Sequence, residues 1–293
     1  MKYKFEVCAD APRSCLHAFL AGVDSVELCA GLRIGGITPT AGLVRQVWRL
    51  NQEASKRLGR PPVRLKVLVR PREGDFCYSI CDYQAMAEDI VDLYAAGADE
   101  VVIGGLTPDG ALDLGGIKRL LDEYCAGRPV SCHRAFDMCA HPEAALEQLV
   151  ALGFTSILTS GGASNAYAGV SQLKEWHKLA SGRINLIAAG GVGKSNIAAL
   201  AQESGLTYFH FSAKEQVPSP MVFRKDNVAM GSSDFDEYSR TESSLAEINA
   251  NIIMLEGAPR VSIEVQQNVL KQLEMVVVPR LTASKMNQEA KQE

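Results

Sequence analysis

Short apolar runs alternate along the chain with longer segments in which apolar residues recur every three or four positions. Short apolar runs are typical of buried strands, and the three-to-four spacing is typical of amphipathic helices. The pattern predicts strands at residues 3–8, 25–29, 63–69, 100–103, 129–133, 156–159, 184–188 and 207–211. It predicts helices between them at residues 11–21, 43–57, 82–96, 117–125, 142–152, 170–180 and 194–203, followed by one more at 243–255.

Several of these helices end at a glycine just before the next strand, as at Gly22, Gly97, Gly153 and Gly205. Glycine accepts the left-handed backbone conformation that closes a helix. Strands and helices in this alternation predict a (β/α)8 TIM barrel over residues 1–257, close to the roughly 250 residues usual for that fold. A doubly wound open sheet is the alternative. It normally carries a glycine-rich phosphate turn after its first strand, which residues 8–12 lack.

The barrel rhythm stops after the last predicted helix, so residues 258–293 form a C-terminal extension that we expect to be helical or partly disordered. Residues 261–273 are weakly amphipathic, residues 275–278 are apolar, and the final eleven residues, 283–293, are polar. The sequence leaves open whether the apolar part packs on the barrel or on a second subunit.

Composition narrows the class of protein. The chain has 293 residues, 47% of them hydrophobic, which is enough for a full core. A net charge of −4 gives no electrostatic case for nucleic acid or an anionic membrane as partner. No apolar run approaches the roughly 18 residues of a membrane span, and the N-terminus leads directly into the first predicted strand. We therefore expect a cytoplasmic protein.

Eight cysteines are scattered through the chain, a pattern that favours reduced thiols in a chain of this size. The close pair Cys77 and Cys81 lacks a second pair to complete a zinc site. Two other cysteines stand in a repeated Glu-x-Cys pattern, Glu6 with Cys8 and Glu27 with Cys29, each closing a predicted strand. Since side chains alternate along a strand, all four point to the same side if the strands are neighbours. The two thiols would then lie side by side and suit Cu(I).

Polar side chains follow nearly every predicted strand, where a barrel of this kind has its active site. Arg70 and Arg72 could bind a carboxylate or phosphate bidentately, or pair internally with neighbouring acidic residues. Gly190 and Gly191 after the seventh strand, with Ser212 after the eighth, occupy the usual phosphate-binding loops. The same glycines would also serve a plain tight turn, so an anion site and a structural turn remain alternatives.

His133, after the fifth strand, titrates near neutrality and could act as acid, base or ligand, with Asp137 to orient it. A hydrogen-bonded structural role is the alternative. His210 carries the same ambiguity with less weight. No lysine stands at a strand end in a position that favours Schiff-base chemistry.

Seven ordered motifs between about residues 5 and 255 resemble the CutC copper homeostasis family. They are Glu6-Val7-Cys8, Glu27-Leu28-Cys29 with Gly35-Gly36-Ile37-Thr38-Pro39, Arg70-Pro71-Arg72-Glu73-Gly74-Asp75-Phe76, His133-Arg134-Ala135-Phe136-Asp137, Leu158-Thr159-Ser160-Gly161, Ala189-Gly190-Gly191-Val192 and Val228-Ala229-Met230-Gly231. The resemblance implies a TIM barrel, a cytoplasmic homo-oligomer (dimer or tetramer) and a role in copper tolerance, with Cys8 and Cys29 as the copper thiols. It says nothing about the C-terminal extension.

Three functions remain open. The first is a copper homeostasis protein that binds Cu(I) through Cys8 and Cys29. The second is an enzyme acting on a small phosphorylated or carboxylated metabolite, with Arg70, Arg72 and the late loops holding the anion and His133 or Asp137 moving protons. The third is a scaffold whose C-terminal extension recruits a partner.

Overall fold

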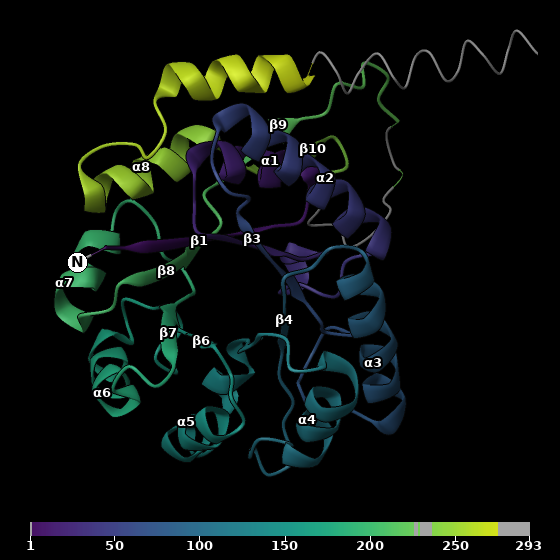
Figure 1. Ribbon diagram of the computed structural model, residues 1–293, viewed down its shortest axis with the longest axis vertical. Helices are drawn as coiled ribbons and strands as arrows, with labels where there is room; N and C mark the ends of the chain where they lie inside the picture. The colour runs from purple at the N-terminus through teal and green to yellow at the C-terminus, as the bar shows by residue number, and fades with distance from the viewer. Residues whose placement is uncertain (1, 226–227, 229–235, 275–293) are drawn as a thin grey trace, which may run out of the picture.

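The computed structural model describes residues 2–225, 228 and 236–274. Eight parallel strands close into a barrel, and each pairs with its neighbour in chain order (Figure 1). The strands are β1 (Lys4–Ala9), β2 (Ser25–Leu28), β3 (Arg64–Leu68), β4 (Glu100–Ile103), β5 (Val130–Cys132), β6 (Ser156–Thr159), β7 (Asn185–Ala188) and β8 (Tyr208–Phe211). The predicted (β/α)8 barrel is confirmed, and every predicted strand is present within two residues at either end.

Helices surround the barrel on its outer face (Figure 1). They are α1 (Pro12–Ala21), α2 (Ala41–Leu58), α3 (Ile80–Ala95), α4 (Leu114–Leu120), α5 (Pro142–Ala151), α6 (Val170–Ala180), α7 (Ile197–Ser204) and α8 (Leu245–Glu256). Capping explains where two of them depart from the predicted starts. Ser79 and Asp82 form a reciprocal capping box, so α3 begins at Ile80. Asp113 accepts a hydrogen bond from the Gly116 N–H, so α4 begins earlier than residue 117.

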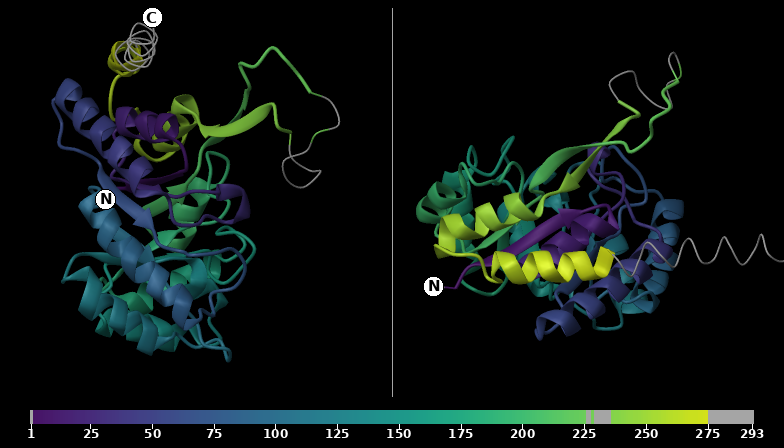
Figure 2. Two further views of the ribbon diagram at one scale, coloured as in Figure 1. Left: turned by 90° about the vertical axis from the view of Figure 1, so that its right-hand side faces the viewer. Right: turned by 90° about the horizontal axis from the view of Figure 1, so that it is seen from above.

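An antiparallel hairpin, β9 (Lys214–Pro218) and β10 (Ser239–Ser243), follows the barrel and was missed by the sequence analysis. It projects from the barrel in Figure 2. β9 and β10 are largely polar and partly exposed, so they lack the apolar alternation that marks a half-buried strand. Residues 229–231 of the seventh family motif lie outside the described residues.

The C-terminal extension packs against the barrel as far as the structure describes it. Residues 263–274 are helical and run beside α1 and α2 (Figures 1 and 2). Val269 and Leu273 are buried in the main core, while Asn249 and Gln266 exchange two side-chain hydrogen bonds of 2.7 and 3.1 Å. Residues 261–273 therefore pack on this chain's own barrel. The apolar run at 275–278 and the polar end at 283–293 lie outside the described residues.

The barrel interior has a charged layer below an apolar one. Lys66 lies at the centre of the charged layer, 2.9 Å from Glu6 and 3.8 Å from Glu100. The residues toward the carboxyl ends of the strands are mostly apolar and include Cys29, Leu68, Val102, Leu158, Ile187 and Ala189, which form one buried cluster with Tyr208. Side chains two positions apart on a strand point to the same face, so both residues of each Glu-x-Cys pattern point into the barrel.

Candidate functional site

A cavity of about 130 Å³ opens at the carboxyl ends of the barrel strands. Residues from β1, β2, β3 and β8 and from the loops after several strands converge on it, although they are spread over two hundred positions of sequence. The lining residues are Cys8, Glu27, Cys29, Leu32, Gly35, Leu68, Arg70, Phe76, His133, Arg134, Leu158 and His210. Of the predicted site residues, the cavity brings together Cys8, Cys29, Arg70 and His133.

The two cysteines share this cavity but are not lateral neighbours. The β1–β2 register places Cys8 opposite Glu27. Cys29 lies two residues further along, which is about 7 Å of strand length. The stagger that closes a barrel sets this offset, and the sequence does not show it. The thiols therefore stand diagonally, with the Glu27 carboxyl beside Cys8.

Cys29 is the more enclosed of the two thiols, with Gly36 packed over it and only 1% of its surface exposed. Its Sγ lies 3.7 Å from Glu27 Oε2, to which the thiol donates. Burial and the neighbouring Glu27 raise the pKa of the Cys29 thiol well above its ordinary value. Burial also raises the pKa of the Glu27 carboxyl, and the opposing effects of His210 and Lys66 compensate too little.

His210 lines the same cavity as Cys8 and is held by the Glu6 carboxylate. Its Nδ1 is 2.9 Å from Glu6 Oε1 and its Nε2 is 3.8 Å from Glu27 Oε2. Burial alone would lower the pKa of His210, but its interactions with Cys8, Glu6 and Glu27 raise it well above its ordinary value. Burial would raise the pKa of Glu6, yet Lys66 and His210 together bring it well below its ordinary value.

Glu27 and His210 line the cavity, but the sequence analysis did not include them among the candidate site residues. Glu27 belongs to the Glu-x-Cys pattern, and its parity already indicated an inward side chain. His210 alternates with Phe209 and Phe211 on β8, which was a signal that it points into the barrel. The alternation of side chains along a strand was enough to predict that both residues point into the barrel.

Arg70 and Arg72 lie in different surroundings. Arg70 lines the cavity, and its terminal nitrogens donate to the carbonyl oxygens of Ile34, Gly36 and Gly74 at 2.6–3.2 Å. Arg72 is bound 3.0 Å from Asp75 and 3.5 Å from Asp82, outside the cavity lining. The internal pairing weighed from the sequence is present at Arg72. The guanidinium of Arg70 ties two loops together.

His133 lines the cavity, whereas Asp137 does not. His133 Nδ1 accepts a hydrogen bond from the Ala135 N–H at 3.1 Å, and burial together with Arg70 lowers the pKa of the imidazole to about 3. The ring is therefore neutral with its proton on Nε2, which has no hydrogen-bond partner. Asp137 accepts from the N–H groups of Ser160 and Gly162 and pairs with Arg134 at 2.7 Å, so it organises the loop after β6.

The late loops also stand apart from the cavity lining. The Gly190 carbonyl accepts from the Ala166 N–H, and the Gly191 carbonyl accepts from the Asn196 side chain. The first contact joins this turn to the loop after β6, and the second closes the turn on itself. Ser212 follows β8 without reaching the lining. Gly190, Gly191 and Ser212 thus lie around the mouth of the barrel but not in its cavity.

No group of three or more histidine, cysteine, aspartate or glutamate side chains is arranged to hold a metal within residues 2–225, 228 and 236–274. In the same ranges, no helix combines the length and apolarity needed to cross a membrane. All eight cysteines are free thiols. The donors that the cavity offers a soft ion are the two diagonal thiols.

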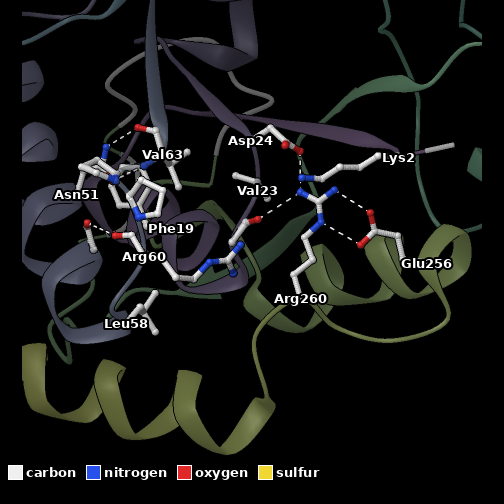
Figure 3. A pocket seen from close by; sticks show the side chains of 14 residues that line it. Lys2, Phe19, Val23, Asp24, Asn51, Leu58, Arg60, Val63, Glu256 and Arg260 are labelled. Carbon is white, nitrogen blue, oxygen red and sulfur yellow. Dashed lines mark hydrogen bonds and ion pairs between the residues drawn. The ribbon is translucent and has the colours of Figure 1, made fainter.

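A second cavity, of about 450 Å³, lies at the opposite end of the barrel (Figure 3). Arg260 lines this cavity and donates hydrogen bonds to Asp24, Glu256 and the Tyr3 carbonyl, each at 2.7 Å. These contacts satisfy the guanidinium and fix the start of the C-terminal extension to β1 and β2. Residues at this end of a TIM barrel serve stability.

The sequence of this chain is similar to a known protein family and to several of its members. Residues 3–215 match the model of the CutC family. A CutC family protein of Bacteroides thetaiotaomicron is 43% identical over 248 residues, covering 84% of this chain and 96% of the relative. One from Vibrio cholerae is 39% identical over 239 residues, covering 81% of this chain and 90% of the relative.

The fold of this chain is also similar to that of solved structures. One is from Streptococcus agalactiae, and its name describes a candidate copper homeostasis protein CutC. It is 31% identical, with a TM-score of 0.65, and the match covers 72% of this chain and 98% of that one. A Rubisco-like protein from Rhodopseudomonas palustris is 15% identical with a TM-score of 0.52, over 72% of this chain and 59% of that one, and shares the fold alone.

Proposed function

Since this chain belongs to the CutC family, we propose that it serves copper homeostasis by binding Cu(I) through the Cys8 and Cys29 thiols. The observation that carries the proposal is that both cysteines line one small cavity at the carboxyl ends of β1 and β2. Thiolates are soft ligands, and a low coordination number suits Cu(I). Copper is the cargo here.

Cu(I) titration under reducing conditions, in competition with a chromogenic Cu(I) chelator, tests the proposal. The Cys8→Ser/Cys29→Ser variant should lose one equivalent of tight binding. The Cys77→Ser/Cys81→Ser variant removes two thiols outside the cavity and should bind like the wild type. Equal affinity and stoichiometry in the wild type and the Cys8→Ser/Cys29→Ser variant would remove the proposal.

We further propose that the protein works in the cytoplasm as a homo-oligomer, a dimer or tetramer. Eight unpaired cysteines favour a reducing compartment, and the family resemblance supports self-association. Analytical ultracentrifugation of the full chain at micromolar concentration tests the assembly. A monomer at all concentrations contradicts it.

A second candidate function is an enzyme acting on a small phosphorylated or carboxylated metabolite. The observation in its favour is that Arg70 Nε and His133 Nε2 are buried without hydrogen-bond partners on two side chains that line the cavity. Buried donors of this kind are rare in folded proteins and indicate a missing acceptor. A thermal-shift screen of small carboxylates and phosphates tests it, and no stabilisation across the panel contradicts it.

A further inference from the structure

The hairpin β9–β10 continues into an arm that projects away from the barrel and carries exposed apolar side chains (Figure 2). We define the arm as residues 214–225 and 236–243. Met221, Val222 and Phe223 follow β9, and they are 55%, 95% and 70% exposed. The described part of the chain therefore leaves three consecutive apolar side chains uncovered. A contiguous apolar patch of this kind marks an interaction surface in a soluble protein.

The apolar segment of the arm is held in a defined shape. The Ser219 N–H donates to the Tyr238 carbonyl at 2.8 Å, and the Lys225 N–H donates to the Tyr238 hydroxyl at 2.6 Å. The Arg224 guanidinium also lies 4.2 Å from the centre of the Tyr238 ring. Both ends of residues 219–225 are thus tied to one tyrosine. A segment ordered in advance loses less conformational freedom when it binds a partner.

A second set of exposed apolar side chains surrounds the mouth of the barrel. These residues lie after β2, β3, β5 and β6, at the end of the barrel where all the strands have their carboxyl ends. We call them the rim patch: Ile34, Ile80, Met138 and Tyr167, which are 42%, 75%, 67% and 43% exposed. The arm begins at the same end, after β8, but it projects away from its own barrel (Figure 2). Its three apolar side chains therefore leave their own rim patch uncovered.

The charges of the arm and the rim are complementary. Arg224 and Lys225 directly follow the apolar segment of the arm. On the rim, Glu73 after β3 and Asp109 after β4 are exposed, and neither forms an ion pair within the described residues. Arg134 on the same rim is already paired with its neighbouring aspartate at 2.7 Å. Complementary charge of this kind orients two surfaces as they meet.

We propose that the arm of one copy of this chain packs on the rim patch of a second copy, mouth to mouth about a two-fold axis. The proposal rests on the proposed homo-oligomer and names its interface. A second copy is favoured over an unrelated protein because this chain carries both complementary halves. In a two-fold contact each copy gives its arm and receives the partner's arm, so both halves are used twice. The contact covers the mouth that leads to the cavity of Cys8 and Cys29.

Cross-linking of the full chain tests the contact. Cys81 is an exposed native thiol next to Ile80 of the rim patch, and Val222→Cys adds a thiol to the arm. A bismaleimide should convert this variant to a covalent dimer on a denaturing gel, with linked peptides that contain positions 222 and 81. Val222→Cys/Cys81→Ser should lose this link. Val265→Cys, at a valine that is 43% exposed on the C-terminal helix, should give no link to position 81.

Analytical ultracentrifugation gives a second measurement. Val222→Ser/Phe223→Ser should raise the dissociation constant of the oligomer by about tenfold or more. Ile263→Ser/Val265→Ser is the matched control, since it removes two apolar side chains, each 43% exposed, from the C-terminal helix. Its dissociation constant should equal that of the wild type.

The outcomes separate this interface from the proposed assembly. An oligomer that forms no link between positions 222 and 81 and is unaffected by the arm variant overturns the interface, while the homo-oligomer stands. Weakened assembly without the link places the arm on another surface and overturns the mouth-to-mouth contact. A link confined to the monomer band shows that the arm folds onto its own rim, which also overturns it. A monomer at all concentrations contradicts both proposals.

Discussion

Lys66 Nζ lies 2.9 Å from Glu6 Oε2 in the interior of the barrel, where the two side chains are 3% and 0% exposed. Lys66 also faces Glu100 and donates to the hydroxyls of Ser131 and Ser156 at 3.4 and 3.3 Å. Lys66 therefore faces both buried carboxylates, while His210 also contacts Glu6 and Arg64 lies 3.4 Å from Glu100. This relationship fixes Glu6, and through Glu6 it fixes His210 beneath the cavity.

Replacing Lys66 by methionine should lower the free energy of unfolding by about 3–5 kcal/mol, because it leaves buried charge uncompensated. Urea denaturation measures the change. Lys178→Met is the matched control, since Lys178 pairs with Glu175 at 2.7 Å on the exposed surface and should cost less than about 1 kcal/mol. Similar losses in the two variants would show that the interior pair contributes no more than a surface pair.

The free energy of unfolding should fall on acidification, in part because the pKa of His133 is lowered in the folded protein. Its pKa is lowered to about 3 in the folded protein, by burial and by Arg70, from an ordinary 6.5. Below pH 6.5 His133 binds a proton in the unfolded chain but not in the folded protein. The free energy of unfolding therefore falls as the pH falls toward 3. Between pH 7 and pH 5 this single group should cost about 2 kcal/mol.

Urea titrations of wild type and His133→Phe at the two pH values measure this contribution as a difference of differences. The variant should lose about 2 kcal/mol less than the wild type on acidification, whatever its stability at pH 7. Parallel pH profiles would mean that His133 takes up its proton in the folded state.

The turn after β6 should tolerate no side chain at Gly169. A Cβ there would overlap the Ser160 carbonyl oxygen, which belongs to the backbone and cannot swing aside. Gly169→Ala should therefore lower the melting temperature, at a cost of about 1–3 kcal/mol. Gly193→Ala is the control, because no atom lies within 4 Å of its added Cβ, and its cost should stay within about 0.5 kcal/mol. Equal effects would mean that the loop yields without strain.

Arg260 should be the main attachment of the C-terminal extension to the barrel. Arg260→Met removes charged hydrogen bonds to Asp24, Glu256 and the Tyr3 carbonyl, and we expect a loss of about 2–3 kcal/mol by urea denaturation. Arg183→Met, which breaks an exposed pair with Glu147, should cost less than about 1 kcal/mol. A loss no greater than that control would mean that the other contacts of the extension, including the Asn249–Gln266 hydrogen bonds and the buried Val269 and Leu273, hold it in place.

The sequence by itself determined the barrel and the inward direction of the Glu-x-Cys residues. Both follow from local rules, because the order of apolar runs and amphipathic segments fixes the elements and the period of two fixes which side chains share a face. The family motifs, quoted residue by residue, identified the correct family. The polar hairpin β9–β10 was not predicted, because its strands lack an alternation of apolar and polar residues.

Only the tertiary structure decided which of the polar residues meet. Barrel closure staggers each strand against the next, so Cys8 stands opposite Glu27 and not opposite Cys29, and Glu6 stands opposite His210. The loop conformations, which depend on long-range contacts, leave Arg70 and His133 in the cavity wall while Arg72 and Asp137 bind their own loops. Register and loop closure join residues far apart in the chain, and such distances are set by packing and not by local sequence.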